Sequence, residues 1–179
     1  KKYTSDSTQT YQFLAESLRR GHNTRSHFVG DPDYFYVPIS DLLSKNRIAE
    51  LFKTIDSNKS SSVDQIKAFK PRIEGKDTTH FSIIDKDGNA VSNTYTLGLS
   101  FGSGVTIPDT GILINRKMNN FAYRYGEKNV IGRVASPGNR FEPGKKPMST
   151  MSPTIIFDKD DDLFLITGSP GGSDIPAAI

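Results

Sequence analysis

The fold class is decided around one stretch, Lys76-Asp77-Thr78-Thr79-His80-Phe81-Ser82, because the chain changes character at Thr78. Before it, residues 57–76 are rich in Ser and Lys and show no hydrophobic period, which predicts a polar, basic linker. After it, short runs of β-branched and aromatic residues alternate with turn residues, which predicts strands. Helices first and strands afterwards favour an α+β fold.

Two helical segments are predicted ahead of the linker. The first, residues 5–20, has its apolar side chains on one helical face: Tyr11, Leu14, Ala15 and Leu18. Ser5 and Ser7 are candidate N-caps, and Gly21 is a candidate stop. The second helix is expected after Pro38, with a buried face made of Ile48, Leu51, Phe52 and Ile55.

Two β-hairpins are predicted after Thr78. Strands at 80–84 and 90–97 flank the turn 85–89, and strands at 154–157 and 163–167 flank the turn 158–162. A further short strand is expected at 112–114. The two acidic turns do not match a calcium-binding EF-hand loop, which needs Gly at its sixth position and a late bidentate Glu.

Composition excludes several kinds of site. The chain has no Cys, which removes disulfides, Cys-based zinc sites and a thiol nucleophile. His22 and His27 lie five apart, which is not the spacing of a helical metal pair, so no metal site is expected. The net charge of +3 is concentrated in the linker, so nucleic-acid binding is not expected either. No apolar run is long enough to span a membrane.

A threonine nucleophile is the chemistry that remains. Thr78 alone is compatible with an ordinary strand start, because β-branched residues favour strands. A hydroxyl fixed at the start of a strand, beside a flexible linker, is also what self-cleavage requires. The Thr78 hydroxyl would attack the carbonyl of Asp77, an ester would replace the amide, and water would release a new N-terminus. The freed α-amine titrates at about 7.7–8.0 in model compounds, so it can act as the base for its own hydroxyl.

A glycine-rich turn follows the last predicted strand, Gly168-Ser169-Pro170-Gly171-Gly172-Ser173. It lacks the Lys-Ser/Thr of a phosphate-binding loop and the spacing of a dinucleotide-binding fingerprint. Adjacent glycines let backbone N–H groups turn toward an anion, and the transient oxyanion of acyl transfer suits such a turn.

Together, these features resemble the γ-glutamyltranspeptidase family. The matching motifs occur in family order over essentially the whole chain: Gly30-Asp31-Pro32-Asp33, 78–82, 87–92, 101–104, 111–115, 146–154 and 168–173. The resemblance implies the four-layer αββα fold of the N-terminal-nucleophile hydrolases, incomplete in this chain. It also implies a precursor that splits after Asp77, so that residues 1–77 end a large subunit and residues 78–179 begin a small catalytic subunit.

The resemblance further implies an enzyme that transfers the γ-glutamyl group of glutathione-like donors to water or amines, through an ester on Thr78. Thr96 matches the second threonine, which hydrogen-bonds to the nucleophile, and the oxyanion hole is formed by Gly171 and Gly172. Ser149 and Thr150 stand where the family's paired serines bind the donor α-carboxylate. No cofactor is implied, and the family indicates a periplasmic or secreted enzyme.

The donor pocket departs from the family pattern. The family usually has Asn-Asn-Glu/Gln-Met-Asp-Asp-Phe where this chain has Asn115 and the six residues after it. The Glu/Gln becomes Lys117, and the Asp that grips the donor α-ammonium becomes Asn120. Gly98 replaces a side chain that helps to hold the amine, and Ile131 replaces an aromatic residue of the lid. These changes predict a weaker preference for donors with a free α-amine.

Two alternatives remain open. An amidohydrolase of the acylase or poly-γ-glutamate depolymerase type would keep the fold and the nucleophile but use another donor. A processing-dead relative would only bind a ligand or a partner. Cleavage at Thr78 separates the second alternative from the enzymes, and donor kinetics separate the first. The arginine that binds the donor carboxylate in the family comes from far upstream, so the chain is expected to be a fragment.

Overall fold

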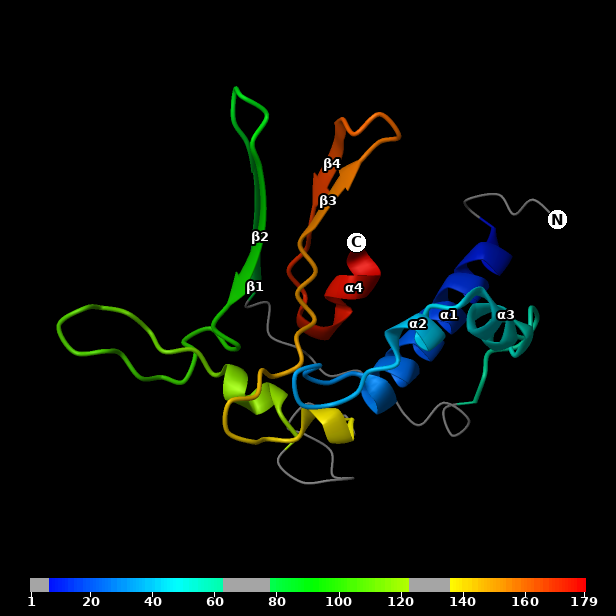
Figure 1. Cartoon of the computed structure of the whole chain (residues 1–179), viewed down its shortest axis with the longest axis horizontal. Helices are drawn as coiled ribbons and strands as arrows, with labels where there is room; N and C mark the ends of the chain where they lie inside the picture. The colour runs from blue at the N-terminus through cyan, green and yellow to red at the C-terminus, as the bar shows by residue number, and fades with distance from the viewer. Residues whose placement is uncertain (1–6, 63–77, 123–135) are drawn as a thin grey trace. The chain divides into compact units, whose positions relative to one another are not determined.

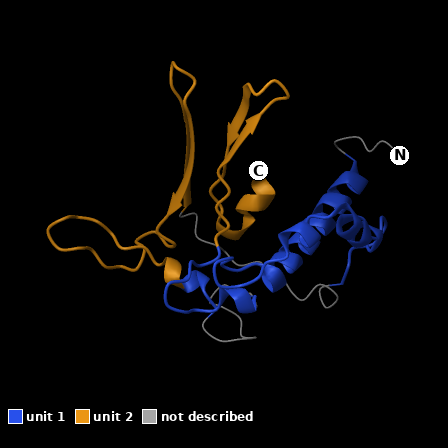
Figure 2. Ribbon diagram, viewed as in Figure 1, with its two compact units in different colours: residues 1–71, 119–148 blue, residues 72–118, 149–179 orange. Residues whose placement is uncertain are grey.

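The computed structural model describes residues 7–62, 78–122 and 136–179. Asp77, Ile131 and residues 63–76 of the predicted linker lie outside these ranges. The chain forms two compact units, shown in Figure 2: residues 1–71 with 119–148, and residues 72–118 with 149–179. The longer helices belong to the first unit and the four strands to the second, which confirms the α+β class (Figure 1).

The first unit begins with α1 (Thr8–Phe28). Ser7 is its N-cap, because the Ser7 Oγ accepts a hydrogen bond from the N–H of Thr10 at 3.2 Å. The stop predicted at Gly21 is wrong, since the helix continues through this residue to Phe28. A glycine inside a helix costs only about 1 kcal/mol relative to alanine, which the rest of a long helix readily offsets.

The segment after Pro38 forms two helices where one was predicted, α2 (Ile39–Leu42) and α3 (Lys45–Lys53). Ser44 divides them, because its Oγ accepts from the N–H of Arg47 at 3.2 Å and starts a new helix. The described residues also form short 3₁₀ helices and one further turn of α-helix: η1 (Lys117–Asn120), η2 (Pro137–Asn139), η3 (Gly172–Asp174) and α4 (Ile175–Ala178).

Several residues of the apolar faces predicted for the helices are exposed in this chain. Tyr11 and Leu14 of α1 are 58% and 54% exposed, and Ile48 and Phe52 of α3 are 54% and 53% exposed. Instead, α1 turns Glu16 inward, where it is only 1% exposed. The side of α1 that faces residues 54–61 thus includes a buried charge, which a hydrophobic pattern does not predict, and the ring of Phe13 on the same helix stacks on Phe52 with centroids 5.4 Å apart.

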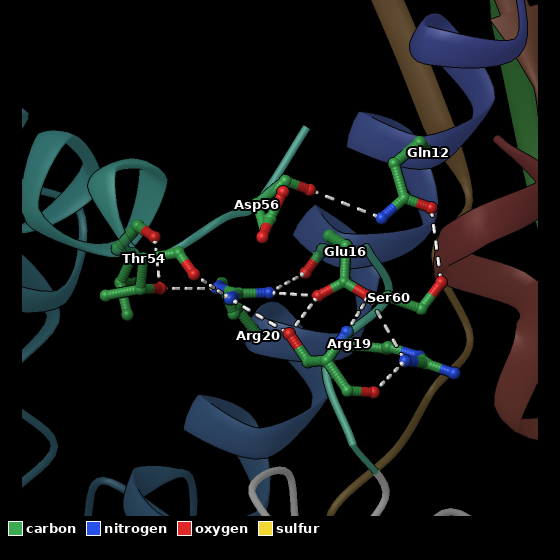
Figure 3. A network of polar contacts seen from close by, with 9 residues as sticks. Gln12, Glu16, Arg19, Arg20, Thr54, Asp56 and Ser60 are labelled. Atoms are coloured by element: carbon green, nitrogen blue, oxygen red, sulfur yellow. Dashed lines mark hydrogen bonds and ion pairs between the residues drawn. The ribbon is translucent and has the colours of Figure 1, made fainter. Parts of the chain in front are cut away.

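Figure 3 shows the polar network around Glu16, which joins α1 to residues 54–61. The Glu16 Oε2 lies 2.6 Å from the Arg20 Nη1 and accepts from the Ser61 Oγ at 2.6 Å. Arg20 in turn donates to the Oγ1 and the carbonyl of Thr54. Burial opposes ionisation of Glu16, but hydrogen bonds from Ser61 and Arg20 outweigh it and hold the pKa of this carboxyl below its ordinary value. The first residues of the predicted linker, up to Ser61, are thus held against α1.

A second set of contacts in the first unit ties the Gly30-Asp31-Pro32-Asp33 motif to residues 136–148. Asp31 is buried, and its Oδ2 accepts from the N–H of Lys146 at 2.7 Å. Lys146 also places its Nζ 2.7 Å from the Asp33 Oδ2. Gly30 approaches Gly138 so closely that a Cβ would lie 2.5 Å from the Gly138 carbonyl carbon. In this structure the motif therefore binds residues 136–148, a segment that is distant in the sequence. We call this set of contacts the joint between residues 30–33 and 136–148.

The second unit contains two antiparallel hairpins. The first is β1 (Thr78–Ile84) with β2 (Ala90–Thr96), and the second is β3 (Thr154–Phe157) with β4 (Leu163–Thr167) (Figure 1). Both hairpins agree with the predicted strands. The strand predicted at 112–114 is wrong: there the structure has only an isolated bridge between Thr106 and Leu113. Backbone hydrogen bonds flank the bridge, from Ile107 to Ile112 and from Ile114 to Val105, but the positive φ values of Gly104 and Gly111 interrupt the extended backbone beyond them.

One face of the first hairpin carries polar side chains and is buried at Thr78 and Thr94. Side chains alternate between the two faces of a strand, and the register places one set together: Thr78, His80 and Ser82 opposite Thr96, Thr94 and Ser92. Thr78 and Thr94 of this set are both 8% exposed. The other face carries Phe81 and Tyr95, whose exposed rings meet edge to face with centroids 6.3 Å apart.

Candidate active site

The candidate nucleophile is the first residue of β1. Thr78 is buried, and the register makes it the direct cross-strand partner of Thr96. The Cβ atoms of residues paired in this way lie about 4.5–5.5 Å apart, within reach of short side chains. The structure thus brings the two threonines together on one face. That a hydrogen bond joins their hydroxyls stays a prediction.

The orientation of Thr96 is set by the turn that follows β2. Its Oγ1 accepts from the N–H of Gly98 at 2.9 Å. A hydroxyl that accepts in this way keeps its own proton as a donor, so Thr96 has the polarity needed to donate to Thr78. Gly98 has a φ of +92°, a conformation that residues with a side chain rarely adopt. The turn therefore favours glycine at position 98, and the expectation that a donor-binding side chain is lost there stays a prediction.

His80 follows the nucleophile on the same face. Its Nδ1 lies 2.8 Å from the Thr94 Oγ1, and its Nε2 lies 3.0 Å from the Ser82 Oγ. A Ser-His-Asp triad needs a carboxylate on the far side of the imidazole, to orient the ring and stabilise its charged form. Here that position is held by the hydroxyl of Thr94. A serine hydrolase built on His80 and Ser82 is therefore not supported.

The glycine-rich turn leaves the end of β4. Gly171 and Gly172 have φ values of +130° and +57°, and Gly172 begins η3. The N–H of Asp174 donates to the Gly171 carbonyl at 3.0 Å, which fixes the turn on its C-terminal side. Two successive residues with positive φ explain why glycine occupies both positions. Their service as oxyanion donors stays a prediction.

The two hydroxyl residues expected to hold the donor carboxylate lie just before β3. The Ser149 Oγ accepts from the N–H of Met151 at 3.1 Å, and the Thr150 carbonyl accepts from the Ser152 Oγ at 3.1 Å. These local bonds shape a tight turn of the kind that serine and threonine favour. Carboxylate binding by Ser149 and Thr150 stays a prediction.

The residues expected at the donor amine lie at and around η1. Asn115 accepts from the N–H of Lys117 through its Oδ1 at 2.9 Å. At the other end of η1, the Asn120 Nδ2 donates to the Met148 carbonyl at 3.2 Å. A carboxylate could not make this bond, because it has no proton to donate at neutral pH. The asparagine at position 120 thus holds the residue immediately before Ser149.

Sequence reasoning missed Asn139, which supports this arrangement. Asn139 is 1% exposed, and its Nδ2 donates to the Asn120 carbonyl at 2.7 Å. Its Oδ1 accepts from the N–H of Met148 at 2.9 Å. One buried amide therefore clamps both Asn120 and Met148. Nothing in the pattern around Asn139 could have indicated this, because its partners lie at other points of the chain.

Metal clusters and membrane spans are both absent from the described residues. Among them, no group of three or more His, Asp or Glu side chains is arranged to hold a metal ion. In the same ranges, no helix combines the length and apolarity needed to cross a membrane. The cleavage-site residue Asp77 and the lid position Ile131 lie outside the described residues.

A family model described as gamma-glutamyltranspeptidase matches residues 1–179. The chain belongs to the gamma-glutamyltranspeptidase family. This confirms the resemblance drawn from the motifs. Among its relatives, the glutathione hydrolase proenzyme of Escherichia coli (strain K12) is 42% identical over 176 residues, which cover 98% of this chain and 30% of the relative. The chain thus spans about a third of the length of this relative.

Solved structures of gamma-glutamyltranspeptidases resemble the chain as well. The enzyme from Pseudomonas nitroreducens complexed with L-DON is 51% identical, with a TM-score of 0.52, over 56% of this chain and 51% of that one. An acivicin-inhibited gamma-glutamyltranspeptidase is 45% identical, with a TM-score of 0.51, over 55% of this chain and 52% of that one. The latter structure is described as revealing critical roles for the C-terminus of that protein in autoprocessing and catalysis.

Proposed function

We propose that this chain is part of a γ-glutamyltranspeptidase proenzyme that cleaves itself between Asp77 and Thr78. Thr78 then transfers the γ-glutamyl group of a glutathione-like donor to water or to an amine. One observation carries the proposal: in a chain of this family, Thr78 is a buried hydroxyl residue at the first position of a strand, directly opposite Thr96. The related protein of E. coli is a glutathione hydrolase and a proenzyme, which agrees with both parts.

The cleavage step uses the hydroxyl of Thr78. Its oxygen attacks the carbonyl carbon of Asp77, the C–N bond breaks, and the Thr78 nitrogen takes up the proton and becomes a free amine. Water then hydrolyses the ester, which leaves a carboxylate on Asp77 and restores the hydroxyl. Thr96, whose Oγ1 accepts from Gly98, donates to the Thr78 oxygen and holds it in line.

Turnover repeats the same chemistry on the donor. The Thr78 oxygen attacks the γ-carbonyl carbon, and its proton passes to the freed α-amine. The negative charge on the carbonyl oxygen is stabilised by the backbone N–H groups at Gly171 and Gly172. The amine of the donor leaves with the proton, and an ester on Thr78 remains. Water or an acceptor amine attacks this ester, which releases glutamate or a new γ-glutamyl compound.

The rest of the proposed assignment follows from the family. Residues 1–77 end a large subunit and residues 78–179 begin the small subunit, within a four-layer αββα fold. Ser149 and Thr150 hold the donor α-carboxylate, and the enzyme works in the periplasm or outside the cell. The identity of 42% to the E. coli protein over 98% of this chain supports carrying these features over.

A related amidohydrolase with a different donor is the second candidate. It is favoured by the amide of Asn120, which donates to the Met148 carbonyl and therefore carries no negative charge for a donor ammonium. Lys117 on the same short helix adds a cation. A donor whose α-amine is blocked or absent would lose less in such a pocket than glutathione does.

The experiment is made on the complete protein. Intact mass and N-terminal sequencing of the smaller product should give Thr-Thr-His-Phe-Ser as its first residues. The Thr78→Ala variant should remain uncleaved and inactive toward a γ-glutamyl anilide, while Thr78→Ser, which keeps a hydroxyl, should cleave slowly. An active wild-type protein with this peptide bond intact would falsify the assignment, and a protein that neither cleaves nor turns over any donor would support a binding relative.

A further inference from the structure

The first hairpin meets the end of β4 at His80 and at Ser92. The three heavy atoms nearest to a Cβ built on Gly168 all belong to the imidazole of His80, and the Cβ would overlap them. The imidazole therefore packs so closely against Gly168 that it leaves no room for a methyl group there. Beside it, the Ser92 Oγ donates to the Thr167 carbonyl at 3.0 Å, which ties the same strand end to β2.

This contact connects the strand that carries the proposed nucleophile, Thr78, to the segment that leads into the proposed oxyanion-binding turn at Gly171 and Gly172. His80 is two residues after Thr78 and on the same face of β1. Gly168 is the residue immediately after β4 and three before Gly171. All of these residues belong to the second compact unit.

We propose that His80 is a positioning residue, whose ring sets the separation between Thr78 and the Gly171-Gly172 turn. The inference rests on the proposed function and assigns to His80 no proton transfer. The α-amine of Thr78 serves as the base, and His80 acts only through Gly168.

The geometry suits this role because the ring is held from its own hairpin. The His80 Nδ1 is 2.8 Å from the Oγ1 of Thr94, a buried residue, and its Nε2 is 3.0 Å from the Ser82 Oγ. Both bonds go to side chains of the same face, so the plane of the imidazole is fixed before Gly168 packs on it. Because two hydrogen bonds hold the imidazole of His80 in place, the ring can set the distance between β1 and Gly168.

The size of the expected effect follows from the demands of acyl transfer. Oxyanion donors act only at hydrogen-bond distance from the developing charge. A displacement of about 1 Å away from the reacting atoms can cost about 100-fold in rate. A methyl group forced between Gly168 and the ring would cause a shift of this order, because the two surfaces are already in contact.

The test is a double-mutant cycle in the complete enzyme, with Gly168→Ala, His80→Ala and both together. The three atoms nearest to the new methyl group all belong to the His80 ring, and the φ of Gly168 lies outside the left-handed region, so the ring is the main obstruction to alanine. We expect Gly168→Ala to lower kcat by about tenfold or more, while KM changes little because Ser149 and Thr150 hold the donor. The double variant should recover part of this loss, since the ring is gone. Gly21→Ala is the matched control, with open space around its Cβ, and should behave as wild type.

Two further measurements keep the inference falsifiable if Gly168→Ala folds poorly. His80→Phe keeps a flat ring and loses both nitrogens, while His80→Asn keeps a polar group and loses the ring. The inference expects the phenylalanine variant to retain more kcat than the asparagine variant, and the pH profile of kcat to keep its limb near neutrality in both.

Loss of that limb would make His80 a base and overturn the inference. So would a double variant no better than Gly168→Ala, or an asparagine variant that matches the phenylalanine one. A wild-type enzyme without cleavage or turnover would overturn the proposed function together with this inference, whereas an active wild type with an uncoupled cycle would overturn this inference alone.

Discussion

Thr78 and Thr96 occupy opposite positions at the end of the β1–β2 hairpin, so that the first residue of one strand faces the last residue of the other. The two strands that carry these threonines are paired at every position from this end of the hairpin to its turn. The Thr96 Oγ1 is oriented in addition by the N–H of Gly98. The position of Thr96 relative to Thr78 is therefore fixed by the pairing of β1 with β2 and by the turn at Gly98.

Replacing Thr96 by valine should slow both self-cleavage and turnover. Valine keeps the β-branched shape but has no hydroxyl to orient the Thr78 oxygen, and losing such a group costs about 10²–10³ in rate. Single-turnover cleavage and kcat on a γ-glutamyl anilide measure the effect. Thr96→Ser is the control and should retain most of both rates. A valine variant with unchanged kcat would remove Thr96 from the site.

Glu16 should contribute to stability at neutral pH and lose this contribution in acid. Its pKa is held below the ordinary value of 4.5 by Ser61 and Arg20, despite its burial. A carboxyl whose pKa is lowered by folding stabilises the folded state above about 4.5, and that stability is lost as the pH falls through the lower, folded-state pKa. Glu16→Gln should lower the free energy of unfolding by about 3 kcal/mol at pH 7.

Urea unfolding of wild type and Glu16→Gln between pH 7 and pH 3 tests this directly. The difference in unfolding free energy between the two proteins should begin to narrow below about pH 4.5 and continue to narrow as the pH falls, because only the wild type becomes protonated at position 16. Glu50→Gln is the matched control, since Glu50 is an exposed glutamate that pairs loosely with Arg47 on α3. A difference in unfolding free energy that stays constant with pH would show that the charge of Glu16 does not contribute to stability.

Donor preference should respond to Asn120 and Lys117 together. We expect Asn120→Asp with Lys117→Gln to raise the ratio of kcat/KM for γ-glutamyl over glutaryl anilides by about ten- to a hundred-fold, the value of a charge-assisted hydrogen bond. The double variant should also be less stable, because a carboxylate at position 120 cannot donate to the Met148 carbonyl. Lys117→Gln alone is the control, with a smaller expected change. If wild type already prefers the γ-glutamyl donor strongly and the double variant leaves the ratio unmoved, other residues hold the amine.

The buried contact between Asp31 and Lys146 should contribute more to stability than the exposed ion pair between Asp33 and Lys146. Asp31 is buried and accepts backbone N–H groups from Lys146 and Asp33. The hydrogen bond from Lys146 is the main reason that the pKa of Asp31 lies below its ordinary value. Asp31→Ala should therefore lower the urea midpoint of the cleaved protein clearly, whereas Asp33→Ala, which removes only an exposed ion pair, should change it little. Equal effects of the two variants would contradict this ranking.

The sequence predicted what depends on near neighbours. Both hairpins were found, because alternation and turn residues act within a few positions, as in the Asx bonds from Asp85 that close the first turn. The buried face of α1 was missed, because it depends on Ser61, which lies 45 residues from Glu16. The packing of Gly168 on His80 was missed for the same reason. The motifs predict which residues form the site, whereas the contacts of these residues with one another depend on the fold.

The joint between residues 30–33 and 136–148 acquires a further meaning if the chain is cut after Asp77. Asp31 and Lys146 would then lie on two separate polypeptides that share one folded unit. Such a unit assembles while its halves are tethered, at a high effective concentration that the cut abolishes. Once unfolded, the nicked protein must reassemble by a bimolecular encounter, so dilution should suppress its recovery while the uncut Thr78→Ala protein refolds independently of concentration. Processing would make the native state easier to lose than to regain.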